Sequence, residues 1–509
     1  MDSSHASDAA GSPGQRWVQR SLWCAILLGG LLRLWNAWHT SFWLDDFHSL
    51  YHARAENLAQ LFQGLLQDNH PPLSFLLLRL SEHSLGAGEW TLHLPNLIVA
   101  LCSAWLLWRL CAKLEPGRAP KPTLRLGALA FLALSSMHVD LSSNLRMYAL
   151  LGLCVLGLLG ALIDLMERGK GQLQGVLWLV LGLHTHYHFL HASALLFLVS
   201  LVLIFGARVY RARLRGLLLT YGIGFGLALP WYLYGFQAQL AHELAPGGSE
   251  VSLRQLAMGC LHLLHQGVGD YGSSWRPLFL AGGASALLAA LAGQLQLLRS
   301  AKQNGRPAAA VFLASGAWLL PLWTASAAAL SQRAGFEPRY LVGALTPMAL
   351  LAGIGCFGLG EQARWPRLLG LAAGALSLST ALALSGLLAN SSGHEDYRSA
   401  SASILQQAAP GDGILAADWQ PAFFPHGIGW SYYSQELNPE SAARLVSLEH
   451  DEHFNLLEPE RLDSLARVHC LLRSIPREAA LIQKLRSFYG QERTQSFGRG
   501  VYVLSFGQP

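Results

Sequence analysis

The feature that most constrains this chain is a series of apolar runs, each long enough for a membrane-spanning helix, separated by short loops rich in arginine and lysine. A helix needs roughly 20 mostly apolar residues to cross a bilayer. The chain of 509 residues is 52% hydrophobic and only 13% charged, whereas an ordinary soluble domain has roughly 25% charged residues. The composition therefore predicts a polytopic membrane protein and excludes an ordinary soluble enzyme.

The charged residues divide the chain near Asn390. Before this point the loops carry the basic excess that gives the whole chain its net charge of +5, and after it acidic residues outnumber basic ones. No lysine- and arginine-rich stripe with interleaved aromatic residues occurs, so we predict no nucleic-acid partner. Basic short loops indicate the cytoplasmic side of a membrane protein. We therefore predict a cytoplasmic N-terminus (1–21), a transmembrane domain (22–388) and an extracytoplasmic C-terminal domain (389–509).

The first apolar run and the segment after it set the predicted topology. We interpret 22–38 as an uncleaved signal anchor that places its C-terminal end outside, because no small-residue cleavage site follows it. The run 71–80 is apolar but only about half as long as a spanning helix. We expect this run to lie in the outer interface, so that 39–91 form one large external segment.

The later runs alternate in direction so that every basic cluster falls on the cytoplasmic side. The run 175–205 is too long for one span and has basic residues at both ends, so we predict a hairpin that turns near Tyr187. Further external loops are predicted at 139–146 and 237–276. The prediction totals about eleven spans, namely 22–38, 92–114, 124–141, 147–166, the two halves of 175–205, 217–236, 277–298, 308–330, 340–359 and 368–388.

The tail alternates helix-like and strand-like patterns. Helical spacing covers 396–407, a turn leads into a strand at 411–419, a proline starts a helix in 476–490, and a strand covers 500–506. The predicted fold class is thus an all-α polytopic membrane protein with about eleven transmembrane helices and a small C-terminal extracytoplasmic α/β domain.

Two adjacent carboxylates, Asp45 and Asp46, follow the first apolar run in the sequence SFWLDDFHSLY. One interpretation is a solvated acidic exit from the membrane. The alternative is a pocket covered by the amphipathic stretch and the short apolar helix that follow. A partly desolvated carboxylate in such a pocket is a reasonable general base.

Other polar residues occur where predicted helices meet the outer surface. Asp68 and His70 precede two prolines, Pro71 and Pro72. Prolines at this position commonly do no more than start a helix, and one interpretation gives this segment no further function. Asp140, Arg146 and Tyr148 lie in and beside the predicted loop 139–146. An arginine at the head of a span can simply anchor it at the interface, or it can bind a phosphate, because the guanidinium matches two phosphate oxygens.

Histidines cluster at the predicted hairpin tip, in LHTHYHFLHASA. His184, His188 and His191 share one helical face, and the first two have the i, i+4 spacing of a zinc pair. No carboxylate accompanies them and structural zinc prefers four ligands, so polar packing is the favoured interpretation. We predict no cofactor and no assigned metal site, and a divalent metal stays open as an alternative.

The order of these motifs, rather than any one of them, carries a family resemblance. WLDD, HPPL, RMYALL, THYHF and RYL follow one another, and the first span contains Arg33. This order resembles the integral-membrane GT-C glycosyltransferases over roughly 20–360, and in particular the bacterial branch related to protein O-mannosyltransferases and lipid A aminoarabinose transferases. The resemblance implies transfer of a sugar from a polyprenyl-phosphate carrier.

The resemblance also implies roles for individual residues. It makes Asp45 the base and Asp46 its acidic neighbour, although relatives usually have glutamate at the second position. It assigns Arg146, with Tyr148, and Arg339, with Tyr340, to the donor phosphate. Many relatives have an acidic residue where this chain has Asn144, so Asp140 is the substitute second carboxylate. Further pocket candidates are Asp68, His70, Asp140, Tyr148 and His186.

The predicted function is that of an inverting glycosyltransferase, a hexosyl or pentosyl transferase of the cell envelope. Its donor is a polyprenyl-phosphate sugar, its acceptor a hydroxyl of a lipid, glycan or protein, and its location the plasma (inner) membrane with the active site outside. Neither a P-loop nor a dinucleotide fingerprint is visible. The alternatives are a multi-span transporter or flippase of lipid-linked sugars, which would place ionisable residues near the bilayer midplane, and a membrane-anchored scaffold.

Overall fold

The computed structural model of the protein divides into two compact units. The first comprises Met1–Ala37, Phe62–Leu77 and His93–Leu388, and the second comprises Trp38–Leu61, Leu78–Leu92 and Ala389–Pro509. Most of the predicted external segment 39–91 therefore packs with the C-terminal domain. The structure describes residues 13–114, 122–242, 276–304, 307–331, 338–358, 368, 371–380, 395–417, 427–450, 456–473, 480–497 and 500–507.

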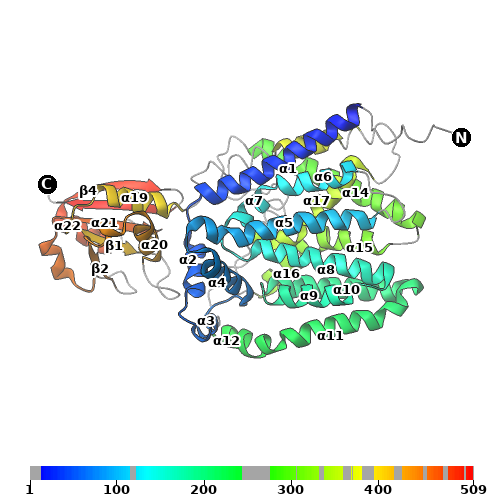
Figure 1. The fold of residues 1–509 in the computed structure, drawn as a ribbon, viewed down its shortest axis with the longest axis horizontal. Helices are drawn as coiled ribbons and strands as arrows, with labels where there is room; N and C mark the ends of the chain where they lie inside the picture. The colour runs from blue at the N-terminus through cyan, green and yellow to red at the C-terminus, as the bar shows by residue number, and fades with distance from the viewer. Residues whose placement is uncertain are drawn as a thin grey trace. The chain divides into compact units, whose positions relative to one another are not determined.

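The first unit is built of helices that run side by side (Figure 1). Short 3₁₀ and π segments interrupt several of them. Its elements are α1 (Pro13–His39), α5 (Glu89–Leu114), α6 (Pro122–Ala133), α7 (Ser136–Ser143), α8 (Tyr148–Arg168), α9 (Gln172–Leu183), α10 (His188–Gly206), η2 (Arg208–Arg213), α11 (Leu214–Trp231), η3 (Tyr232–Phe236), α12 (Gln237–His242), α14 (Arg276–Asn304), α15 (Ala308–Ala314), η4 (Ser315–Leu319), α16 (Leu320–Ser331), η5 (Pro338–Leu341) and α17 (Val342–Phe357).

The helices confirm a multi-pass membrane protein. Among the described residues, six helices are long and apolar enough to cross a membrane, or seven if one bent pair is counted as a single span. The predicted hairpin is present as α9 and α10, which are joined by a turn at 184–187. The figure of about eleven spans stays a prediction. Of the last predicted span, 368–388, the structure describes a helix over Leu371–Thr380, and most of the predicted loop 237–276 lies outside the described residues.

The external segment between α1 and α5 contains three short helices, α2 (Leu44–Ala53), α3 (Leu58–Leu65) and α4 (Leu73–Leu85). The last of these covers the predicted interfacial run 71–80. With 13 residues, α4 is too short to span a membrane, in agreement with the hydropathy argument.

The predicted span 124–141 is present as two helices, α6 and α7, which are bent by 63° and count together as one broken span or as a re-entrant loop. Arg33 of α1 explains how the break is stabilised. Its guanidinium is 8% exposed and donates to the carbonyl oxygens of Ala133 at 2.6 Å and Leu132 at 3.2 Å. The Ala133 carbonyl lies at the end of α6, where helical carbonyls lose their partners, whereas the Leu132 carbonyl also accepts the Ser135 N–H at 3.3 Å. Ser135 then caps α7 by accepting the His138 N–H at 3.1 Å. The predicted loop 139–146 is consequently helical as far as Ser143.

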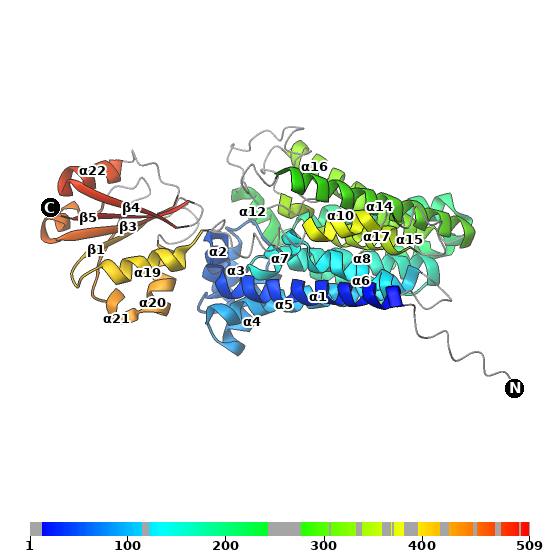
Figure 2. The same ribbon diagram turned by 90° about the horizontal axis from the view of Figure 1, so that it is seen from above.

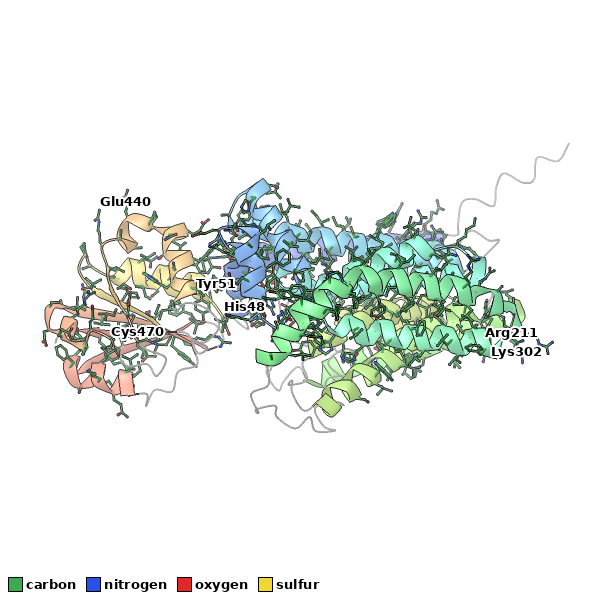
Figure 3. All side chains as sticks on the ribbon, turned by 90° about the horizontal axis from the view of Figure 1, so that it is seen from below. His48, Tyr51, Arg211, Lys302, Glu440 and Cys470 are labelled. Atoms are coloured by element: carbon green, nitrogen blue, oxygen red, sulfur yellow. The ribbon has the colours of Figure 1, made fainter. Side chains whose placement is uncertain are left out.

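The basic loops meet at one end of the first unit, as the charge argument requires. Lys113 lies 2.5 Å from Asp164, which also pairs with Arg168 at 2.9 Å. Glu167 accepts hydrogen bonds from the Tyr210 hydroxyl and the Ala308 N–H. Arg211 and Lys302 also lie at this end (Figure 3). Four loops that are far apart in sequence thus share one basic face.

The second unit contains a five-stranded sheet with the strand order β2-β1-β3-β5-β4. The first three strands are parallel, and β5 is antiparallel to both of its neighbours. Figure 2 shows α22 on one face of the sheet and α19 with α20 on the other. Its elements are α19 (Tyr397–Gln407), β1 (Gly413–Ala417), α20 (Ile428–Leu437), α21 (Pro439–Ala442), β2 (Val446–Leu448), η6 (Pro459–Ser464), β3 (Arg467–Arg473), α22 (Ala480–Tyr489), β4 (Gln491–Phe497) and β5 (Val501–Gly507).

Alternation along the strands builds the core of this domain. Val468, Cys470 and Leu472 of β3 pack with Leu485 and Tyr489 of α22. The helices predicted at 396–407 and 476–490 and the strands predicted at 411–419 and 500–506 are confirmed as α19, α22, β1 and β5.

Replacing Arg33 should destabilise the bundle at the α6–α7 break. Arg33→Ala leaves the Ala133 carbonyl without its donor, whereas the Leu132 carbonyl keeps the Ser135 N–H. We expect a loss of about 1–3 kcal/mol, the usual cost of one buried unsatisfied group. The midpoint of thermal unfolding in detergent measures this loss. Arg20→Ala, which removes an exposed arginine of the same helix, is the control. Equal midpoints for the two variants would contradict the stabilising role of Arg33.

The side of the membrane on which α4 lies can be tested by cysteine labelling. Ser84 is exposed, whereas the Ser81 hydroxyl is buried and donates to the Thr91 carbonyl. After replacement of the exposed Cys24 and Cys102, we expect Ser84→Cys to react with an impermeant maleimide in intact cells. Arg211→Cys should react only after permeabilisation. The reverse pattern would overturn the predicted topology.

Candidate active site

A chain of buried polar groups joins Arg146, His70 and Asp68 in the first unit. The Arg146 guanidinium (4% exposed) lies 3.1 Å from His70 Nε2, and His70 Nδ1 lies 3.2 Å from Asp68 Oδ1. Arginine can only donate, so Nε2 must be the acceptor and Nδ1 must carry the hydrogen that is donated to Asp68. The carboxylate therefore fixes the imidazole tautomer that receives Arg146.

The backbone around Arg146 is held by groups from other helices. Asn96 of α5 donates to the main-chain carbonyls of Asn144 at 2.5 Å and Arg146 at 2.9 Å. The Leu73 N–H at the start of α4 donates to the His184 carbonyl at 2.9 Å. Gln239 of α12 donates to the His70 carbonyl at 3.1 Å. The loop before α8, the segment before α4 and the α9–α10 turn are thereby fixed to one another.

Aromatic rings place a second arginine, Arg339, near the Arg146–His70–Asp68 group. The Arg339 guanidinium lies 5.2 Å from the centroid of the Tyr148 ring, which is a cation–π distance. Tyr340, next to Arg339 in η5, has its ring centroid 5.8 Å from that of His186 and 6.2 Å from that of Tyr148. His186 in turn lies 5.4 Å from His70. Seven predicted residues therefore converge: Asp68, His70, Arg146, Tyr148, His186, Arg339 and Tyr340.

His186 provides a polar group that faces this cluster without a partner. The residue is 6% exposed, and its Nε2 has no hydrogen-bond partner among the described residues. Arg146 and Arg339 are both close enough for their charges to act on this ring. The cluster contains two guanidinium groups and one carboxylate, so its net charge is positive when the histidines are neutral. Such a buried site is suited to an anion, and a phosphate matches the guanidinium geometry.

The remaining predicted residues of this unit are Asp140 and the other histidines around the α9–α10 turn. Asp140 is buried in α7, and its role as a second carboxylate stays a prediction. His184 points back to its own helix, where its Nδ1 lies 2.8 Å from the Val180 carbonyl. Within the described part of the first unit, His184, His188 and His191 do not bring three ligand atoms together for a metal. His188, whose ring lies 4.3 Å from that of Tyr340, belongs to the aromatic cluster instead.

Asp45 and Asp46 lie in the first turn of α2, in the second unit. Asp46 is 2% exposed and Asp45 is half-buried. Carboxylates are stabilised at this end of a helix by its dipole. The helix is anchored to the C-terminal domain, because Tyr433 accepts the Phe42 N–H at 2.7 Å and Glu395 accepts the Leu44 N–H at 2.9 Å.

Several functional candidates of the second unit were missed in the sequence. Arg398 of α19 pairs with Glu89 at 2.5 Å and donates to the Thr40 carbonyl at 3.1 Å, so it ties the C-terminal domain to the end of α1. His48 and His52 lie one turn apart on α2 with ring centroids 4.9 Å apart, and Figure 3 labels His48 beside Tyr51. The spacing of four residues between the two histidines could have indicated from the sequence that they share one helical face. Two imidazoles are fewer than the four ligands of a structural zinc site.

Comparison with solved structures agrees with this architecture. Neither a family model nor a curated protein sequence matches the chain. ArnT from Cupriavidus metallidurans in the apo state aligns with 97% of this chain and 98% of its own, at 14% identity and a TM-score of 0.52. The chain has the ArnT fold. The predicted resemblance to the GT-C fold is thereby confirmed at the level of the fold.

Two further matches are more distant. ArnT bound to undecaprenyl phosphate aligns at 12% identity and a TM-score of 0.49, over 97% of this chain and 98% of that chain. The archaeal oligosaccharyltransferase AglB from Archaeoglobus fulgidus, in complex with an inhibitory peptide and a dolichol-phosphate, aligns at 11% identity and a TM-score of 0.46, over 97% of this chain and 75% of that chain.

Replacing Arg339 tests the anion site. Arg339→Ala removes one guanidinium, so we expect at least about tenfold weaker binding of polyprenyl phosphate, and Arg339→Lys should be intermediate because it keeps the charge but loses the bidentate fork. Binding to purified protein is measured by microscale thermophoresis. Arg211→Ala, which removes an exposed arginine at the basic end of the bundle, should bind as the wild type does. Unchanged affinity in Arg339→Ala would make this residue an interface anchor.

Proposed function

We propose that this protein is an integral-membrane glycosyltransferase that moves a sugar from a polyprenyl-phosphate carrier to an acceptor hydroxyl. The observation that carries the proposal is the convergence of Arg146 and Arg339 around the unpartnered Nε2 of buried His186. A buried cationic cluster at helix ends is suited to the phosphate of a lipid. The fold shared with ArnT supports a lipid-linked donor as the first class to test.

The arginines would act on the leaving group. When the bond between the anomeric carbon and the phosphate oxygen breaks, the electron pair goes to that oxygen, and fixed positive charge stabilises it. Arg146 is preorganised for this task, because His70 and Asp68 hold its guanidinium in place before the substrate binds. The Tyr148 ring faces the Arg339 guanidinium, and the Tyr340 ring lies 6.2 Å from that of Tyr148.

Asp45 would act on the acceptor. The acceptor oxygen attacks the anomeric carbon as its proton passes to the Asp45 carboxylate, so the new bond forms on the face opposite the phosphate and the configuration inverts. Asp46 is its buried neighbour, and Asp140 remains the candidate for a second carboxylate. This single displacement needs no nucleotide and no covalent enzyme intermediate.

The proposed setting is the plasma (inner) membrane, with the active site and the C-terminal domain on the extracytoplasmic side. The basic face formed by Lys113, Arg168, Arg211 and Lys302 supports this orientation, because such residues prefer the cytoplasmic side. The acceptor belongs to the class of lipids, glycans or proteins of the cell envelope. A divalent metal is tested by adding EDTA to the transfer assay, with the His48–His52 pair as the first place to look for one.

Replacing the proposed base is the direct test of the reaction. Asp45→Asn should lower transfer by at least about a hundredfold, as expected for loss of a general base, while the protein still folds. Sugar transfer and released polyprenyl phosphate are both measured by mass spectrometry after incubation with a polyprenyl-phosphate hexose or pentose. Near-normal turnover would move the base elsewhere. Movement of the labelled lipid across vesicles by wild-type protein without release of polyprenyl phosphate would favour a flippase instead.

A further inference from the structure

The helix α2 begins without a cap of its own. Trp43 occupies the N-cap position and makes no side-chain capping bond. The first N–H groups of a helix have no partners within it, and a tryptophan side chain cannot accept their hydrogen bonds. Glu395 fills this gap, because its Oε2 accepts the Leu44 N–H at 2.9 Å. A residue 351 positions later therefore caps the helix that carries Asp45 and Asp46.

The capping carboxylate is itself held by the sheet of the C-terminal domain. Glu395 is 8% exposed. Its other oxygen, Oε1, receives Arg473 Nε and Nη2 at 2.6 Å each. Arg473 is the last residue of β3, so the carboxylate bridges the end of a strand and the first turn of α2. One oxygen thus accepts from Leu44 and the other accepts from Arg473.

Glu395 is also coupled electrostatically to Asp45. Burial raises the pKa of Glu395, the charge of Asp45 raises it further, and Arg473 acts in the opposite direction. The interaction between two carboxylates is mutual, so ionised Glu395 opposes ionisation of Asp45. The Glu395 charge therefore acts on the group that takes up the acceptor proton in the proposed reaction.

We propose that Glu395, held by Arg473, is a positioning residue for the Asp45 base, because its carboxylate accepts the Leu44 N–H and so fixes the first turn of α2 with a negative charge beside Asp45. The inference rests on the proposed function, in which Asp45 takes the acceptor proton. A purely structural cap would change stability and the order of α2 but would leave the pH dependence of turnover where it is.

Glu395→Gln tests the charge. Glutamine is isosteric and its carbonyl can still accept the Leu44 N–H, but its NH2 group replaces the oxygen that receives Arg473, and the negative charge beside Asp45 is gone. We expect kcat to fall about tenfold and the midpoint of the acid limb of the pH–rate profile to move about one pH unit lower, because the base then ionises more easily. Glu492→Gln is the matched control, since Glu492 pairs with Arg486 in the same domain at a comparable exposure. Its pH–rate profile should equal that of the wild type.

Glu395→Asp separates the contact from the charge. Aspartate keeps the charge but is one methylene shorter, so it cannot make both contacts at their present lengths. We expect about fivefold faster amide hydrogen exchange in the peptide that covers the first turn of α2, whereas the acid limb stays at the wild-type pH. This exchange is measured on purified protein in nanodiscs and requires no turnover.

The two readouts distinguish failure of this inference from failure of the proposed function. A wild-type protein that transfers no sugar would reject the function, and the exchange measurement would still test the cap. If the wild type is active but Glu395→Gln leaves kcat and the acid limb unchanged, Glu395 does not tune Asp45. If Glu395→Asp leaves exchange in α2 at the wild-type rate, it does not fix the helix either.

Discussion

A guanidinium buried at the end of a helical bundle is costly unless its surroundings supply hydrogen-bond acceptors and compensating charge. Arg146 meets this requirement through His70, whose other ring nitrogen faces Asp68. The requirement ties together three segments, since the loop before α8 carries the arginine, the segment before α4 carries the histidine and the aspartate, and α12 holds the histidine's carbonyl. Loss of the Arg146–His70–Asp68 contacts would therefore also loosen the α9–α10 turn, whose His186 ring packs on His70.

The same principle of a buried ionic anchor recurs in the second unit. Arg473 holds Glu395, and Glu395 holds the first turn of α2, so the C-terminal domain orders the helix that carries the proposed base. Arg398 and Glu89 form a further pair that ties α19 to the end of α1 and the start of α5. Both ion pairs lie within the second unit, so this unit is held together around α2 by charged groups from its helices and from β3.

Hydropathy and charge predicted the hairpin of α9 and α10, the short α4 and the shared basic face, because each depends on local composition. The break between α6 and α7 could not be predicted in this way, since its stabilising group is Arg33, 100 residues before Ala133. Motif order singled out seven residues that the structure brings together, and their role in binding an anion stays a proposal. Motif order could not predict that His70 holds Arg146 across 76 residues, or that Glu395 caps α2, because these pairings arise only from the folded topology.

The central claim is that Arg146, Arg339 and His186 form the binding site for a lipid phosphate. An experimental structure of the protein with polyprenyl phosphate in a nanodisc tests it most directly. If these residues bind the lipid phosphate, its density lies within hydrogen-bonding distance of both guanidinium groups and His186 Nε2. Density at the opposite, basic end of the bundle, near Lys113 and Arg168, with the Arg146 cluster unchanged, would contradict it.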